Sequence, residues 1–270
     1  LLAIYQRLPW RSLIARRVRL ISLLPPRPQT RQPPRSAVPG SHPVQLFTGC
    51  TGELFDAQTL HDARALLHAC GAVIEHESQH CCGALHTHAG LARRGAALMA
   101  QAQAAHPGQT PILSFATGCG AQLRESRTPE FAARVQDIHH WLLTHWPATA
   151  RLRPLPQRVA VHRPCSHQHM LGGADEVAQL LRRIPQIEVV DLDPAGRCCG
   201  AAGHHLLAHP QIADAHLPHK LAQVRERSPD LIVSSNVGCA LHLAGALRRA
   251  GLSQPRVLHP VSLLWAQWDG

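Results

Sequence analysis

The sequence has little that would support side-chain catalysis or a membrane span. No Ser-His-Asp order, Walker loop or dinucleotide fingerprint stands out in its 270 residues. No uncharged stretch reaches the roughly 20 residues that a membrane-spanning helix needs. No Cys-x2-Cys pair occurs either, and such pairs are the short ligand knuckles of zinc ribbons and fingers. These absences leave the nine cysteines as the most informative part of the sequence.

Acidic residues are missing from residues 1–41, which contain eight arginines. This stretch therefore carries most of the formal net charge of +10. Because the basic character belongs to a tail and not to the folded body, we expect no specific nucleic-acid binding.

The N-terminal 43 residues are expected to form a basic amphipathic segment followed by a Pro-rich linker. Residues 1–24 alternate short apolar clusters with arginines, and residues 25–43 contain seven prolines, a composition typical of extended chain. We expect residues 1–35 to contact an anionic membrane surface peripherally, each arginine contributing at most about 1 kcal/mol, screened by salt. Because the first residue is Leu and not Met, we expect the chain to begin inside a longer protein.

A secretory leader is not expected, because arginines interrupt the apolar region and no small-residue cleavage pattern follows. Nine cysteines in such a chain indicate metal or redox chemistry and not structural disulfides. We expect a cytoplasmic protein, with peripheral contact at the cytoplasmic face of the inner membrane.

Eight of the nine cysteines form a repeated pattern, in which a Cys-Cys-Gly motif has one cysteine upstream and one downstream. The offset is 115 residues from Cys50 to Cys165, 117 from Cys81 to Cys198, and 120 from Cys119 to Cys239. Near-constant offsets over three landmarks indicate an internal duplication. Cys70 lies outside the pattern, and we expect it to be structural.

Strand and helix patterns alternate in both repeats. The first repeat predicts strands at 44–47, 72–74 and 111–115, with helices at 60–70 and 91–105. The second predicts strands at 159–161, 187–192 and 231–233, with helices at 174–183 and 212–227. The fold class expected is α/β, with two tandem repeats, each a small parallel sheet flanked by helices. We expect one cysteine-rich domain over 44–150 and a second over 151–270.

The repeated cysteines are placed just past the carboxyl ends of the predicted strands, where parallel sheets collect ligands. Four thiols can hold a tetrahedral zinc ion or an iron-sulfur cluster. Adjacent cysteines cannot easily both bind one small ion, yet they can reach two irons of a larger cluster. Burial as small hydrophobic side chains is the alternative. We predict a 4Fe-4S cluster, with zinc as the alternative in one site, held by Cys50, Cys81, Cys82, Cys119, Cys165, Cys198, Cys199 and Cys239.

Four blocks then carry a resemblance to a known family: 81–90 (CCGALHTHAG), 198–203 (CCGAAG), 235–239 (SNVGC) and 257–261 (VLHPV). They resemble the duplicated cysteine-rich domains of the glycolate oxidase iron-sulfur subunit, which lactate-utilisation proteins and one of the subunits of heterodisulfide reductase share. The resemblance runs from about residue 44 to the C-terminus. It implies an oxidoreductase subunit without catalytic side chains, which receives electrons from an FAD-binding 2-hydroxyacid dehydrogenase subunit and passes them towards the quinone pool.

The sequence departs from the family in several places. The family's N-terminal ferredoxin module is absent, so we expect either a fragment or a reduced form. Relatives with five cysteines per domain have the fifth three residues after the last, where this chain has Gln122 and His242. Arg163 replaces the usual acidic residue before Pro-Cys, and Ser166 stands where histidine is common.

Histidines lie near both cysteine pairs and supply weaker candidates. His86 and His88 follow the first pair and could line or tune that site, although a partly exposed polar position is the simpler explanation for each. His242 shares a predicted helical face with Cys239 and could replace a thiolate, which would make the second site the more oxidising. A different class of function, a structural zinc or docking module, stays open.

Overall fold

The computed structural model describes residues 18–25 and 40–269. The expected Pro-rich linker and most of the expected basic helix therefore lie outside the described residues, as does most of the segment expected to contact a membrane. None of the described helices combines the length and the apolar character that crossing a bilayer requires.

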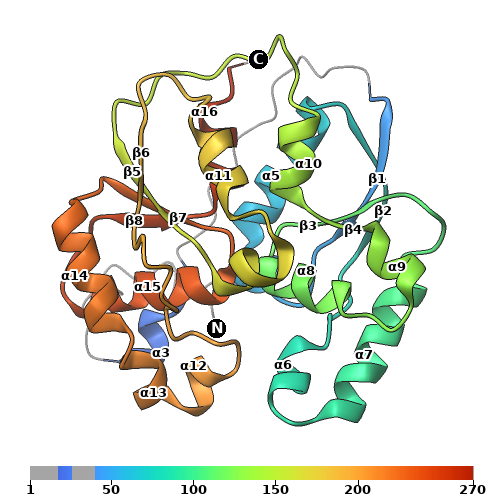
Figure 1. Ribbon diagram of the computed structural model, residues 1–270, viewed down its shortest axis with the longest axis horizontal. Helices are drawn as coiled ribbons and strands as arrows, with labels where there is room; N and C mark the ends of the chain where they lie inside the picture. The colour runs from blue at the N-terminus through green and yellow to red at the C-terminus, as the bar shows by residue number, and fades with distance from the viewer. Residues whose placement is uncertain (1–17, 26–39, 270) are drawn as a thin grey trace.

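Two parallel four-stranded sheets form the framework (Figure 1). The first has the order β2-β1-β3-β4 and the second the order β6-β5-β7-β8, so the corresponding strands occupy the same places. The predicted fold class is confirmed. The strands are β1 (His42–Phe47), β2 (Ala72–Ser78), β3 (Ile112–Ser114), β4 (Val135–Asp137), β5 (Arg158–His162), β6 (Glu188–Asp191), β7 (Leu231–Ser234) and β8 (Arg256–Leu258).

Helices connect the strands in both repeats. The first repeat contains α4 (Gly52–Phe55), α5 (Ala57–Ala69), α6 (Ala84–His88), α7 (Ala92–Ala104), α8 (Thr117–Arg124), α9 (Pro129–Arg134) and α10 (Ile138–Thr144). The second contains the π-helix η1 (His167–Leu171), α11 (Ala174–Leu181), α12 (His205–Ala208), α13 (Pro210–Asp214), α14 (Leu217–Arg227), α15 (Val237–Arg249) and α16 (Pro260–Gln267).

The prediction of one helix over 212–227 was wrong in one respect, because the structure divides this range between α13 and α14. Pro218 lies in the first turn of α14, where its missing N–H needs no partner but where it cannot continue a preceding helix. The sequence patterns also missed β4 and β8, which are only three residues long.

The two repeats exchange their last helices. Helix α16 of the second repeat packs against α5 of the first, and α10 of the first packs against α11 of the second, between the sheets (Figure 1). The largest hydrophobic cluster accordingly includes Leu46 and Leu66 from one repeat and Val161, Leu180 and Trp265 from the other. Each repeat therefore buries its apolar face with help from the other repeat. The domain boundary near residue 150 stays a prediction.

Part of the basic N-terminal segment belongs to the folded body. Helix α3 (Arg19–Ser22) packs against α15, and Arg19 forms an ion pair with Asp214 at 3.0 Å. Leu23 is buried, and a Cβ placed on Gly245 would lie 2.9 Å from its Cδ2 atom. The expectation that the basic character belongs to a tail therefore does not hold for Arg19, because a carboxylate of the second repeat partners it.

Candidate metal centres

The backbone brings all eight repeated cysteines to the carboxyl ends of strands. In the first repeat, Cys50 follows β1, the pair at 81–82 follows β2, and Cys119 lies in the first turn of α8 after β3. The second repeat places its four cysteines in the same way after β5, β6 and β7. Because the carboxyl ends of parallel strands share one edge, the thiols of each repeat converge there.

The four cysteines of the first repeat lie close enough together to shift one another's pKa values. The thiols of Cys50 and Cys82 both donate to Cys81, and Cys82 also contacts Cys119. The backbone N–H of Gly83 donates to the Cys81 sulfur at 3.4 Å. The Cys50 thiol, then the Cys82 thiol and the glycine N–H, lower the pKa of Cys81 to about 2 in spite of its burial. These contacts favour the thiolate form of Cys81.

The second repeat has the same arrangement. The thiols of Cys165 and Cys199 donate to Cys198, Cys199 also contacts Cys239, and the N–H of Gly200 donates to the Cys198 sulfur at 3.3 Å. These hydrogen bonds, that of Cys165 first, lower the pKa of Cys198. Thiolates are the form of cysteine that binds metals, so both four-sulfur sets fit an iron-sulfur cluster or a zinc ion. Their role as ligands stays a prediction, which this convergence supports.

The glycine of each Cys-Cys-Gly motif is required by both its backbone conformation and its surroundings. Gly83 has a φ of 83° and Gly200 a φ of 88°, in the left-handed region that favours glycine. A Cβ on Gly83 would lie 2.4 Å from the carbonyl oxygen of Gly95, and one on Gly200 would lie 2.3 Å from that of Ala213. Helix α7 in one repeat and α13 in the other therefore approach the cysteine turn too closely for any side chain.

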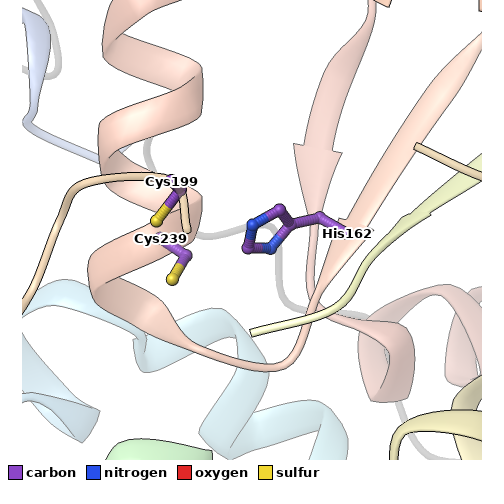
Figure 2. A group of neighbouring side chains, drawn as sticks. All are labelled: His162, Cys199 and Cys239. Carbon is purple, nitrogen blue, oxygen red and sulfur yellow. The ribbon is translucent and has the colours of Figure 1, made fainter. Parts of the chain in front are cut away.

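At the second site the imidazole of His162 points toward Cys199 and Cys239 (Figure 2). One ring nitrogen of His162 and the sulfurs of Cys199 and Cys239 all lie within 4.8 Å of one another. Strand pairing sets His162 opposite Ser234, just as it sets Phe47 opposite Ser114 in the first repeat. A phenyl ring thus occupies the corresponding position there.

One ring nitrogen of His162 is buried without a hydrogen-bond partner among the described residues. Its Nδ1 atom is hydrogen-bonded to the Ser234 hydroxyl at 3.1 Å, and its buried Nε2 atom has no hydrogen-bond partner among the described residues. Burial, and then the charge of Lys220, lower the pKa of His162 to about 3. His162 was not predicted as a site residue, because the sequence contains 21 histidines and any single one is weak evidence. Its place three residues before Cys165, at a strand end, was the available signal.

The ring nitrogens of His242 face α13. Its Nε2 atom donates to the carbonyl oxygen of Ala213 at 3.1 Å, and its Nδ1 atom lies 3.9 Å from a carboxylate oxygen of Asp214. The structure does not join it to the His162 group, and its role as a ligand stays a prediction. Gln122 occupies the equivalent place in α8.

The other histidine candidates differ in their surroundings. His86 is near enough to Cys81 for its charge to help lower that pKa, whereas His88 faces the loop at Gly203 of the other repeat.

Cys70 belongs to the hydrophobic core, and burial raises its pKa to about 12, as expected for a structural cysteine. Arg163 forms an ion pair with Asp191 at 2.9 Å.

The N-terminal ends of α8 and α15, which carry Cys119 and Cys239, meet across the repeat boundary. The side chain of Asn236 caps α15, accepting from the N–H of Gly238 at 3.0 Å, and donates to the Thr117 hydroxyl at 3.3 Å. The N–H of Thr117 donates to the carbonyl of Ser235 at 3.1 Å. The two sites are therefore built on one contact between α8 and α15, which fixes their relative position.

Comparison with known proteins agrees with this geometry. The sequence profile of the cysteine-rich domain matches residues 44–124 and again residues 159–244. The glycolate oxidase iron-sulfur subunit of Escherichia coli is 28% identical over 233 residues, and a subunit of the fumarate reductase (CoM/CoB) of Methanothermobacter marburgensis is 29% identical over 238. Those matches cover 80% and 84% of this chain but only 57% and 46% of the two relatives, so the chain spans about half their length. Lactate utilization protein A of Geobacillus kaustophilus is 24% identical, with 83% of this chain and 99% of that protein aligned.

Proposed function

The chain belongs to the cysteine-rich domain family, and from that premise we propose that it is the iron-sulfur electron-transfer subunit of an FAD-linked glycolate or 2-hydroxyacid oxidase or dehydrogenase. The observation that carries the proposal is the repeated set of four cysteines at corresponding strand ends, each set with a glycine N–H that donates to one sulfur. Relatives named as iron-sulfur subunits support it.

The chain's own residues would hold and insulate the clusters. Cys50, Cys81, Cys82 and Cys119 would bind one 4Fe-4S cluster, and the four matching cysteines of the second repeat another, with zinc as the alternative occupant of one site. Such a cluster supplies one-electron redox chemistry when bound. The N–H groups of Gly83 and Gly200, which already donate to sulfur, would stabilise negative charge there.

The partner in this proposal is a separate FAD-binding 2-hydroxyacid dehydrogenase subunit, which selects the substrate. A cytoplasmic location, with peripheral contact through residues 1–35 at the membrane, belongs to the same proposal. A lactate-utilisation subunit is the second candidate, because lactate utilization protein A aligns over 99% of its length. Activity of the partner with glycolate or with lactate distinguishes the two.

Electron transfer from flavin tests the proposal directly. The cluster-loaded protein, mixed anaerobically with photoreduced FAD, should accept about one electron per cluster and return it to a water-soluble quinone. Loss and recovery of the visible absorption of the protein measures both steps. The Cys82→Ala, Cys199→Ala double variant is the control and should accept none. A loaded protein that reduced FAD leaves unchanged would disprove the relay function.

His162 should tune the second site alone. Replacing His162 with alanine removes a neutral imidazole from beside Cys199 and Cys239, so the reduced and more negative form of that site loses stabilisation. We expect the second-site potential to fall on the order of 50 mV, the equivalent of one hydrogen bond of about 1 kcal/mol for one electron. Redox titration followed by electron paramagnetic resonance measures it.

His242→Ala is the matched control for that measurement, since the nitrogens of His242 face Ala213 and Asp214. A shift of the second-site potential in His242→Ala and none in His162→Ala would show that His242, and not His162, tunes the second site. Equal shifts at both sites in His162→Ala would show a general loss of structure.

A further inference from the structure

A second group of potential ligands lies buried between the two repeats and uses no cysteine. One carboxylate oxygen of Asp137 and one ring nitrogen each of His139 and His167 lie within 4.8 Å of one another. All three side chains are at most 3% exposed. Asp137 ends β4 and His139 is the second residue of α10 in the first repeat, whereas His167 is the first residue of the π-helix η1 in the second.

Hydrogen bonds hold these side chains in place. The Oδ1 atom of Asp137 accepts from the N–H of His139 at 2.8 Å and from its Nδ1 atom at 2.7 Å, which caps α10. The Nδ1 atom of His167 is hydrogen-bonded to the Ser235 hydroxyl at 3.2 Å. The ring of His259 stacks on His139 with centroids 5.4 Å apart. The group is therefore fixed from four separate elements.

Three polar atoms of the group nevertheless lack partners. The Oδ2 atom of Asp137 and the Nε2 atoms of His139 and His167 are buried, with no hydrogen-bond partner among the described residues. His259, by contrast, uses both its nitrogens, donating to the Phe115 carbonyl and accepting from the N–H of Val261. Buried polar atoms without partners are costly, and three within one side-chain group favour a bound species that would partner them.

We propose that Asp137, His139 and His167 bind one divalent transition-metal ion, which ties the two repeats together. Two imidazoles and one carboxylate are a ligand set typical of zinc and of non-haem iron(II). The contact of His139 with Asp137 and that of His167 with Ser235 provide the hydrogen bonds that usually orient ligating imidazoles. The site is independent of the cysteine centres and of the function proposed for them.

Cobalt(II) is a suitable probe, because thiolate ligands give it intense charge-transfer bands and nitrogen or oxygen ligands give only weak visible bands. Titrating the cluster-loaded protein with Co²⁺ should reveal one ion per chain without thiolate bands, displaced by Zn²⁺. In His167→Gln the affinity for Co²⁺ should fall at least about 100-fold. Loss of a ligand should cost more than the 10–100-fold that is typical of losing a group that only orients a ligand.

His106→Gln is the matched control. His106 is also a buried imidazole with an unpartnered Nε2 atom, but it belongs to none of the ligand groups and should bind Co²⁺ as the unchanged protein does. Asp137→Asn keeps a helix-capping side chain and removes the charge, so it should lose the ion even if His167→Gln does not fold. The proposal is overturned if the unchanged protein binds no such ion, which would mean that only buried water partners these side chains. It is also overturned if Asp137→Asn binds the ion with undiminished affinity.

Discussion

Replacing Cys82 with alanine is expected to remove the iron of the first repeat and leave that of the second, so that the total iron content falls by about half. Cys82 connects Cys81 with Cys119 in the sulfur set, and three remaining thiolates cannot complete an all-cysteine cluster. Cys199→Ala should produce the complementary loss, and the double variant should contain no cluster. Iron and acid-labile sulfide, measured after anaerobic reconstitution, give the result.

The control for this series is Cys70→Ala. Cys70, Cys82 and Cys199 are all at most 3% exposed, so the same substitution removes the same buried atoms from each. Cys70 differs in lying outside both sulfur sets, in the largest hydrophobic cluster, and its variant should retain all the iron with a modest loss of stability, on the order of 1 kcal/mol. An iron content equally reduced in all three variants would attribute the loss to packing and refute the ligand assignment.

A methyl group on the glycine of either cysteine motif should destabilise the fold strongly. In Gly83→Ala, the left-handed backbone costs about 1–2 kcal/mol, and contact with the Gly95 carbonyl adds about 1–3 kcal/mol of overpacking. Gly200→Ala should behave likewise against Ala213. The free energy of unfolding, from urea denaturation of the metal-free protein, measures both.

Gly90→Ala and Gly108→Ala separate the two causes. Their φ values of 79° and 78° match that of Gly83, yet a Cβ at either position would meet nothing within 4 Å. They should lose only the backbone contribution, about 1–2 kcal/mol. If Gly83→Ala were no less stable than Gly90→Ala, close packing of α7 against the cysteine turn would not explain this glycine.

The duplication and the strand-end cysteines could be predicted because they depend on local patterns. Period and spacing place Cys81 and Cys198 after corresponding strands, and the structure has them there. The exchange of α10 and α16 between repeats could not be predicted, since it depends on long-range packing of Trp141 and Trp265 that no local period encodes.

The histidines show the same limit of prediction from local sequence patterns. His242 was selected because it lies one helical turn from Cys239, but a carbonyl group of α13, distant in the sequence, takes its Nε2 atom. His162 is near the sulfurs only because strand β5 lies beside β7, which ends before Cys239. Residues that meet through tertiary packing leave only a weak signal in local spacing, and the buried group at Asp137 is a further instance.

Iron and sulfide analysis of the anaerobically reconstituted protein tests the central claim most directly. Two four-cysteine centres predict iron and acid-labile sulfide in equal amounts, about eight of each per chain for two 4Fe-4S clusters, with visible absorption that reductant bleaches. A colourless protein without iron would contradict the claim, and so would zinc at about one per repeat without sulfide.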